Sequence, residues 1–248
     1  MTKDFVGQLQ RQSAWLRDSL LWILQTKVIE PGGYKSKPTA LDIGCGPGFT
    51  MELFSTFADV KGVDIDPEMV KESRLKGLDT EEGAAERLPF DDGSFDIAYC
   101  SFLLMWVKNP LSVVKEMSRV SRRWVVAFAE PDYGARLDYP SELSAITKLV
   151  TEGIRKEGGE PFIGRKLRHL FSQVGLDPEL GVHMGIWGLE KLRTESEGEW
   201  KWIGMTSSGG KDAKLVDLRA VWERALGSGS LFQFNPTFYA VGEKQSSH

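Results

Sequence analysis

The 248-residue chain has little cysteine and no long hydrophobic run. Its two cysteines, Cys45 and Cys100, are too few for a disulfide framework or a cysteine zinc site. This usage fits a reducing compartment and predicts a cytoplasmic location. No apolar stretch reaches the roughly 20 residues that a membrane-spanning helix needs. Charged residues from Lys3 to Asp18 interrupt the N-terminal stretch, so no signal peptide is expected.

Positive charge and histidine are also scarce. A net charge of −4 disfavours a broad nucleic-acid-binding surface. Two short basic runs, at 119–124 and 165–169, are expected to be solvated helix surface. His169 is expected to face solvent. His183 is expected to point from a strand toward the surface, and the alternative is that it reaches the ligand pocket. No cluster of histidine, cysteine and acidic residues has the spacing of metal ligands, so no metal site is predicted.

Hydrophobic periodicity predicts alternating strands and helices. An amphipathic helix over 5–29 is expected to stop at Pro31-Gly32-Gly33. Strands are expected at 39–43, 60–64, 80–83, 95–100, 123–129, 181–189 and 236–244. Helices are expected at 48–57, 67–76, 110–120, 140–156, 164–176, 189–203 and 212–226. This alternation indicates an α/β protein with a parallel sheet between helices, and no linker divides the chain into separate cores.

The stretch "LDIGCGPGFT", residues 41–50, places three glycines between a predicted strand and a predicted helix. Such a turn lets the backbone approach a ligand, with N–H groups available at the helix start. A plain turn remains the alternative. The dinucleotide fingerprint G-x-G-x-x-G does not match, because Phe49 stands where its third glycine belongs. No P-loop sequence follows either, so the turn suits a ligand without phosphates.

An acidic residue ends the next predicted strand, in "VKGVDIDPEM". Asp64 lies where an open α/β sheet hydrogen-bonds a ribose diol, and a carboxylate can accept from both hydroxyls. Asp66 precedes Pro67, which suits the first turn of a helix. We therefore predict that Asp64 binds a ribose and that Asp66 caps the helix.

Three sequences resemble the motifs of the class I S-adenosylmethionine-dependent methyltransferases, in order and over residues 37–130. They are "LDIGCGPG", "GVDIDPEM" and "GAAERLPFDDGSFDIAYCSFLLMWV". Within that family the chain is most similar to small-molecule and quinone-type enzymes. The resemblance implies an open, mostly parallel, doubly wound Rossmann-like sheet of about seven strands, the last antiparallel. It also implies a single domain over 1–248, with a helical cap (1–36), a cofactor-binding half (37–130) and a substrate-covering half (131–248).

The implied cofactor is S-adenosylmethionine. The glycines would pass beneath its methionine part, Asp64 would hold the ribose, and Ile65 would lie against the adenine. The full set of implied cofactor-binding residues is Asp42, Gly44, Cys45, Gly46, Gly48, Asp64, Ile65, Ala85, Glu86, Leu88, Cys100 and Ser101. The chain departs from the family at Ala84, where an aspartate often accepts a hydrogen bond from the adenine amino group.

Methyl transfer from a sulfonium is an in-line displacement that depends chiefly on positioning, and a base is needed only for a protonated acceptor. Candidate catalytic residues follow the strand at 123–129. Glu130 and Asp132 are possible bases, and Tyr133 is expected to line the pocket. In the alternative interpretation Glu130-Pro131-Asp132 is a turn that Asp132 caps.

The chain contains eight tryptophans, several of them in segments that cover the acceptor in this family. They favour a small apolar or aromatic methyl acceptor. The alternative acceptors are tRNA and protein. A second alternative is a protein that binds S-adenosylmethionine without catalysis.

Overall fold

The computed structural model describes residues 3–183, 185–207 and 213–245. Its large sheet consists of β1 (Thr39–Ile43), β2 (Asp59–Asp64), β3 (Asp79–Glu82), β4 (Phe95–Ser101), β5 (Ser121–Pro131), β7 (Glu179–Val182) and β9 (Thr237–Glu243). These seven strands lie in the order β3-β2-β1-β4-β5-β9-β7. The pairs from β3 to β5 are parallel, whereas β9 runs antiparallel to both β5 and β7. The predicted fold class is confirmed.

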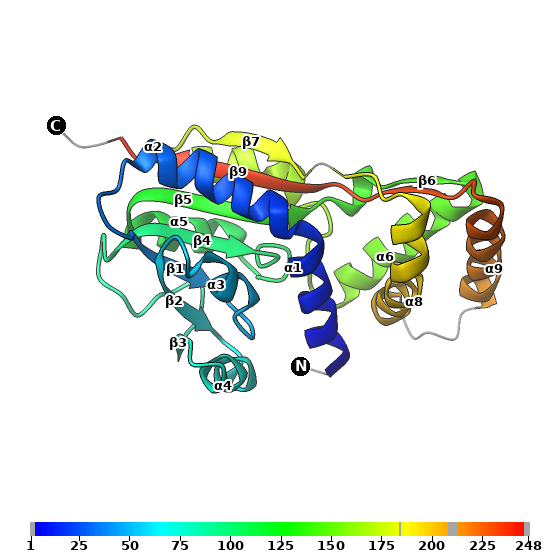
Figure 1. The fold of residues 1–248 in the computed structure, drawn as a ribbon, viewed down its shortest axis with the longest axis horizontal. Coiled ribbons are helices and arrows are strands. Elements are labelled where there is room, and N and C mark those ends of the chain that lie inside the picture. Colours follow the sequence, from blue (N-terminus) through cyan, green and yellow to red (C-terminus); the bar gives the residue numbers. More distant parts are fainter. Residues whose placement is uncertain (1–2, 184, 208–212, 246–248) are drawn as a thin grey trace.

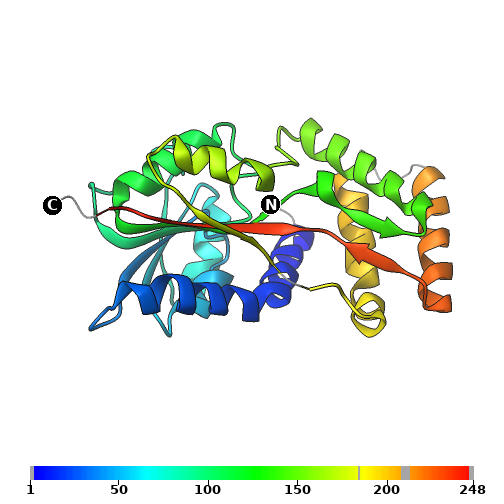
Figure 2. The ribbon, with the colours of Figure 1, turned by 90° about the horizontal axis from the view of Figure 1, so that it is seen from above.

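Helices cover both faces of this sheet (Figures 1 and 2). One face carries α1 (Lys3–Ile23) and α3 (Phe49–Phe54), and the other carries α5 (Pro110–Val120) and α7 (Leu167–Ser172). Side chains of the central strands alternate between two apolar clusters. Tyr99 and Phe128 pack with Leu24 on the α1 side, while Cys100 and Val125 belong to the cluster on the α5 side. This two-residue period is what a strand buried on both faces produces.

The N-terminal helix is longer than predicted and changes its winding. After α1 the chain forms a π-helical segment, η1 (Leu24–Ile29), and a short α2 (Glu30–Gly32). Gly33, with a left-handed φ of 61°, ends it. The predicted breaker Pro31 lies within α2, near its start, where the absence of a backbone N–H is tolerated.

A smaller lobe lies beyond one end of the sheet (Figure 1). It contains α6 (Ala145–Lys156), α8 (Leu189–Thr206), α9 (Ala213–Ser228) and a two-stranded sheet of β6 (Leu137–Tyr139) and β8 (Phe232–Phe234). Three-residue strands are too short for a periodic signal, so the sequence did not predict them. One apolar cluster includes both Val125 of β5 and Trp222 of α9, so the hydrophobic core continues from the sheet into this lobe.

Two local expectations are wrong. The strand expected at 181–189 is shorter, because β7 ends at Val182. Residues 185–188 form no regular structure, and Met184 lies outside the described residues. His183 is 5% exposed instead of lying at the surface. Its ring nitrogens lie 2.7 Å from Ser19 Oγ and 2.6 Å from the carbonyl oxygen of Phe128. The histidine therefore joins α1 to β5.

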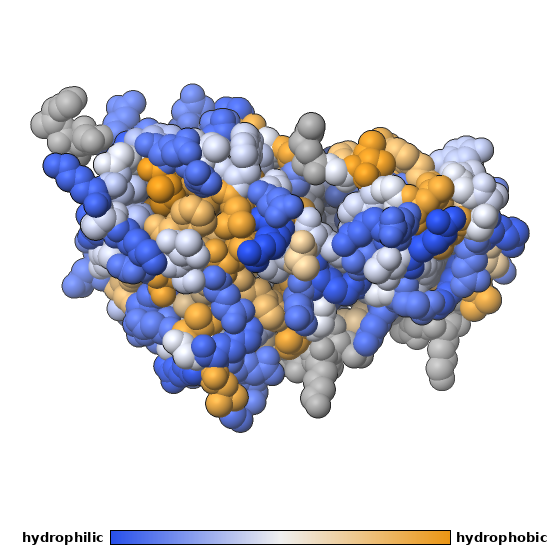
Figure 3. All heavy atoms as spheres, in the orientation of Figure 1, coloured by the Kyte–Doolittle hydropathy of each residue, from blue (hydrophilic) through white to orange (hydrophobic). Residues whose placement is uncertain are grey.

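The described part of the chain contains no group of three or more histidine, cysteine or acidic side chains placed to hold a metal ion. None of its helices has the length and apolar content that a bilayer crossing requires. Figure 3 shows the surface in the orientation of Figure 1, with hydrophobic residues among hydrophilic ones. A broad hydrophobic area lies over the half of the molecule that holds the large sheet.

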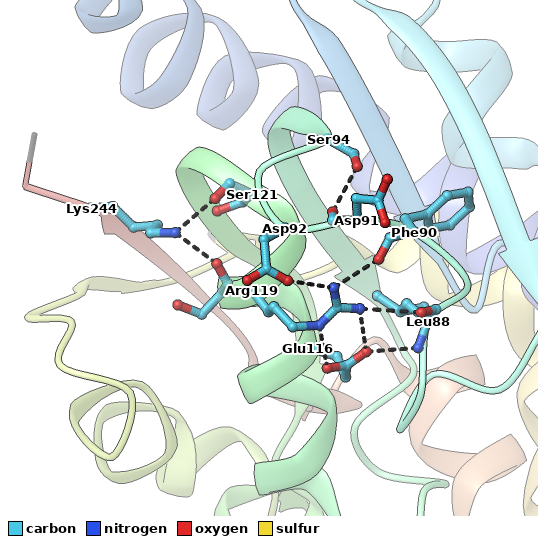
Figure 4. A network of polar contacts seen from close by, with 10 residues as sticks. Leu88, Phe90, Asp91, Asp92, Ser94, Glu116, Arg119, Ser121 and Lys244 are labelled. Carbon is cyan, nitrogen blue, oxygen red and sulfur yellow. Dashed lines mark hydrogen bonds and ion pairs between the residues drawn. The ribbon is translucent and has the colours of Figure 1, made fainter.

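Arg119 on α5 joins the helix to the loop that follows β3 (Figure 4). Its guanidinium donates to the carbonyl oxygens of Phe90 (2.7 Å) and Leu88 (3.2 Å) and to the carboxylates of Glu116 and Asp92. Glu116 also accepts from the backbone N–H of Leu88 at 2.8 Å. This network fixes the loop on which Leu88 and the residues just before it lie.

We expect Arg119→Ala to lower the free energy of unfolding by about 2 kcal/mol, because two backbone carbonyls and Glu116 lose a charged donor. Denaturant titration measures this change. Arg168→Ala is the control, since Arg168 pairs with an almost fully exposed Asp177 and should change stability by less than about 0.5 kcal/mol. Equal stability of the two variants would contradict the role given to Arg119.

Candidate functional site

The predicted ligand-binding residues lie together at one edge of the sheet. The strand register places Ile43 opposite both Val63 and Cys100. The turn after β1, the end of β2 and the end of β4 are therefore neighbours. This is the carboxyl edge of the parallel strands, where open α/β sheets bind their ligands.

The glycine turn needs its glycines. Gly44, Gly46 and Gly48 have φ values of 70°, 53° and 83°, which residues with a side chain rarely adopt. A Cβ on Gly44 would lie 2.6 Å from Leu103 Cδ1, and one on Gly48 would overlap Leu78. The turn N–H groups were expected to be free, but several are paired. Gly44 donates to the carbonyl oxygen of Val63 and Gly46 to Asp64 Oδ2, both at 2.8 Å.

Asp64 is the centre of this edge. The residue is 7% exposed, and its two carboxylate oxygens accept from the backbone N–H groups of Gly46 and Asp66, at 2.8 and 2.9 Å. Burial raises the pKa of Asp64. Each carboxylate oxygen has a second lone pair, so two further donors can bind. Beside it Ile65 is 68% exposed, an apolar surface next to a buried acid.

Asp66 and Asp42 serve the local structure. Asp66 accepts from the N–H of Glu68 at 3.0 Å and caps α4 (Pro67–Leu75), as predicted. Asp42 is 1% exposed and accepts from Thr50 Oγ1 at 2.5 Å, which ties β1 to α3. Burial raises the pKa of Asp42 to about 7.

The residues predicted around the adenine lie on a turn after β3. The N–H of Arg87 donates to the carbonyl oxygen of Ala84 at 3.0 Å, which places Ala85 and Glu86 at the tip. Ala85 and Leu88 are buried, while Glu86 is half-buried. The network of Arg119 fixes the position of this turn.

Glu130, a predicted base, has one carboxylate oxygen paired with protein groups, while its buried Oε2 has no hydrogen-bond partner among the described residues. It is fully buried, and its Oε1 accepts from the N–H groups of Leu103 and Leu104, both at 3.1 Å. The Cys100 thiol lies 3.7 Å from the same oxygen. Burial raises the pKa of Glu130 to about 7. Its carboxylate thus holds the segment after β4, where Phe102 has a φ of 54°, strained for a non-glycine residue.

Asp132 and Tyr133 follow at the end of β5. Asp132 is 1% exposed, accepts two hydrogen bonds from Arg165 at 2.5 and 2.7 Å, and accepts from the N–H of Gly134 at 3.0 Å. It caps the short helix η2 (Tyr133–Ala135), as the alternative interpretation expected, but Glu130 and Pro131 belong to β5 and form no turn. Tyr133 is buried, and burial raises the pKa of its hydroxyl.

A cavity of about 280 Å³ opens beside these residues. Glu130, Asp132 and the glycine turn are not among its lining residues, whereas Tyr133 is. The lining comprises Gln8, Gln12, Trp15, Leu16, Phe102, Pro131, Tyr133, His183, Gly185, Trp187, Lys191, Glu199, Trp202, Gln233, Phe234, Asn235 and Thr237.

The helix α1 connects the cavity with the glycine turn. Its Gln8, Gln12 and Trp15 line the cavity, while a Cβ on Gly46 would lie 3.6 Å from Leu9 Cδ1. The edge that carries Asp64 and the cavity are therefore neighbours under one helix. Sequence reasoning missed the glutamines. Their spacing with Trp15, at i, i+4 and i+7, puts all three on one helix face and could have revealed them.

Residues 41–125 match a family of methyltransferase domains. Over these residues the chain is similar to the class I S-adenosylmethionine-dependent methyltransferases. The resemblance seen in the motifs is confirmed, and S-adenosylmethionine is the cofactor of this family.

The chain is also similar to curated proteins over about half of its length. An uncharacterised protein of transposon TN4556 from Streptomyces fradiae is 35% identical over 150 residues, covering 55% of this chain and 43% of that protein. A demethylmenaquinone methyltransferase from Alkalihalophilus pseudofirmus is 31% identical over 129 residues, covering 48% of this chain and 51% of that enzyme. The chain thus spans about half the length of the curated relatives that it matches.

The whole fold is also similar to solved structures. The BH2331 protein from Bacillus halodurans C-125 superposes with a TM-score of 0.60 and is 17% identical, over 89% of this chain and 98% of that chain. At this identity the comparison shows a shared fold.

Proposed function

We propose that the protein transfers a methyl group from S-adenosylmethionine to a small molecule bound in the cavity beneath α1. When bound, the cofactor supplies an electrophilic methyl group on a cationic sulfur. One observation carries the proposal: a cavity lined by aromatic side chains lies close to the sheet edge that holds Asp64 and the glycine turn.

Cofactor binding is supported by the chemistry of Asp64 and Ile65. The buried carboxylate has unused acceptor positions, which a ribose diol can fill with two donors. The exposed Ile65 side chain provides an apolar surface for the adenine. Gly44, Gly46 and Gly48 would hold the methionine part, because their left-handed φ values form the tight turn at this edge. Ala84 offers no carboxylate, so adenine recognition falls to backbone groups and Glu86.

A small acceptor is supported by the size and composition of the cavity. Its volume of about 280 Å³ is at the lower end of ligand pockets, which begin near 300 Å³. Six aromatic residues line it, together with four side-chain amides. Similarity to demethylmenaquinone methyltransferase points in the same direction. The expected acceptor thus has an apolar or aromatic part and polar groups.

We assign the three predicted catalytic residues different roles. Tyr133 would contact the acceptor, because it lines the cavity and its raised pKa keeps the hydroxyl protonated as a donor. Glu130 would position the segment after β4 through its bonds to Leu103 and Leu104. Asp132 would fix Tyr133 by capping the turn and pairing with Arg165. The last two are thus positioning residues.

A nucleic-acid acceptor is disfavoured by the pairing of the basic runs. The arginines of 119–123 pair with acids, and so do the basic residues of 165–168. The pairs are Arg119 with Glu116 and Asp92, Arg122 with Asp96, Arg123 with Glu243, Arg165 with Asp132, Lys166 with Glu160, and Arg168 with Asp177. Paired arginines and lysines attract phosphates less strongly than an uncompensated basic patch.

The proposal is tested in two steps. Calorimetry should show binding of S-adenosylmethionine and its demethylated product, with NAD as the negative control. Protein with methyl-labelled cofactor is then incubated with phenols, quinones and amines, with bulk tRNA, and with a cell extract separated into small-molecule, nucleic-acid and protein fractions. We expect label in the small-molecule fraction.

Other outcomes select the alternatives. Label only in tRNA or protein would replace the acceptor class. Cofactor binding with no labelled fraction would identify a non-catalytic S-adenosylmethionine-binding protein. Absence of cofactor binding would overturn the proposal as a whole.

A further inference from the structure

A buried charged cluster lies against the cavity in the smaller lobe. Arg136 donates to Asp138 at 2.8 Å and to Glu199 Oε1 at 3.1 Å. Gln233 donates through Nε2 to the same Glu199 oxygen at 2.8 Å. Arg136, Glu199 and Gln233 are each at most 7% exposed, and the side chain of Asp138 is fully buried. One cation and two carboxylates give this cluster a formal charge of −1.

The orientation of Gln233 leaves an oxygen without a partner. A carboxylate only accepts, so the Gln233 nitrogen must face Glu199 and the oxygen Oε1 must face away from it. That buried Oε1 has no hydrogen-bond partner among the described residues, and neither has Asn235 Oδ1. Both residues line the cavity. Two lining residues thus each have a buried acceptor oxygen that lacks a donor, which is costly unless a ligand supplies one.

The cluster presents its negative side to the cavity. Glu199 and Gln233 are lining residues, whereas Arg136 is not. Of the other ionisable residues in the lining, Lys191 forms an ion pair with Glu195 at 2.9 Å. Burial lowers the pKa of His183 and favours its neutral form. Glu199 therefore brings a negative charge to the cavity lining, and Arg136 compensates this charge only in part because it also pairs with Asp138.

Aromatic rings form much of the remaining wall. Trp15 from α1 and Trp187 from the segment before α8 stack edge to face, with centroids 4.8 Å apart. Phe102, Tyr133, Trp202 and Phe234 also line the cavity. Aromatic faces attract a desolvated cation, and a buried carboxylate with an uncompensated charge does so more strongly.

We infer that the methyl acceptor carries a cationic nitrogen with N–H groups, an ammonium or amidinium, that binds Glu199 and the free oxygen of Gln233. The inference rests on the proposed function, because it concerns the occupant of the same cavity. A cation restores neutrality to the cluster, and its N–H groups satisfy the orphaned oxygens. A neutral alcohol supplies one donor and no charge, and a carboxylate is repelled.

Three indole probes of similar shape test the inference: tryptamine (cation), tryptophol (neutral) and indole-3-propionate (anion). Each is titrated by calorimetry near pH 7.5 into protein already saturated with S-adenosylhomocysteine. We expect tryptamine to bind wild-type protein at least tenfold more tightly than tryptophol. Glu199→Gln should reduce this preference to less than about threefold. Glu197→Gln, on the same helix but paired with Arg219 at the surface, should leave it unchanged.

A second variant covers the case in which Glu199→Gln does not fold. Gln233→Met removes the amide oxygen and should weaken the binding of tryptamine. Indole-3-propionate should remain the probe that binds least tightly. Equal or tighter binding of tryptophol or indole-3-propionate to the wild type, or no tryptamine binding at millimolar concentration, would overturn the inference. Because S-adenosylhomocysteine binding is measured first, a protein that fails to bind it contradicts the proposed function instead.

Discussion

Asp64→Ala is expected to lower the affinity for S-adenosylhomocysteine by about 100-fold. Without the carboxylate, the ribose would lose two charge-assisted hydrogen bonds, each contributing about 1.5–3 kcal/mol. Every 1.4 kcal/mol changes the dissociation constant by a factor of about ten. The variant would also lack the hydrogen bonds from the N–H groups of Gly46 and Asp66 to Asp64, which tie the glycine turn to the end of β2. Calorimetry at constant salt measures the change.

Asp64→Asn separates charge from shape. The two N–H donors contact different carboxylate oxygens, so the amide nitrogen of asparagine must face one of them. We therefore expect this variant to lose affinity almost as strongly as Asp64→Ala. Asp66→Ala is the matched control. It removes the cap of α4 and about 1 kcal/mol of stability, but should change the affinity by less than about threefold. Folded Asp64→Ala protein with the affinity of the wild type would contradict the assignment of the cofactor site.

The cofactor half was predictable because its signals are local. Pairing of β1 with β2 and β4 brings three motifs to one edge, and the sequence order of strands and helices already implied that sheet. The left-handed φ values of Gly44, Gly46 and Gly48 follow from the glycines themselves. The partners of the turn N–H groups were not predictable, because Val63 and Asp64 approach only when β2 pairs with β1.

The acceptor half was predicted only in outline. Glu199 and Gln233 are far apart in sequence, and they meet because β6 pairs with β8 and α8 packs beside this small sheet. A buried glutamate on a largely polar helix has no local signature. His183 was assigned to the surface because strand alternation was extended beyond Val182, where β7 ends. Contacts between residues far apart in the sequence determine such positions, and a short stretch of sequence does not show these contacts.

Glu130→Gln is expected to change how stability depends on pH. Burial raises the pKa of Glu130 from 4.5 to about 7, so the folded protein keeps this proton to higher pH than the unfolded chain does. Stability therefore falls as the pH rises from about 4.5 through about 7, and the loss is complete above that range. At about 1.4 kcal/mol per pKa unit, the penalty at pH 8 is about 3 kcal/mol. Glutamine does not titrate and avoids it.

We expect the difference in unfolding free energy between Glu130→Gln and the wild type to change with pH. From pH 5 to pH 8, Glu130→Gln should gain about 2 kcal/mol in unfolding free energy relative to the wild type, as measured by denaturant titration without cofactor. The pKa of Asp42 is raised in the same direction, but both proteins contain Asp42, so its contribution cancels in the difference.

Glu130→Ala distinguishes the charge of this residue from its role as an acceptor. Glutamine retains a carbonyl oxygen for the N–H groups of Leu103 and Leu104, whereas alanine leaves both without it. We expect the alanine variant to be less stable than the glutamine variant by about 3 kcal/mol at every pH, because two largely buried donors lose their partner. A constant gap between wild type and Glu130→Gln from pH 5 to 8 would mean that Glu130 is ionised throughout. A carboxylate that stays charged in this core would need a cation beside it, and the groups that hydrogen-bond to Glu130 are backbone amides and a thiol.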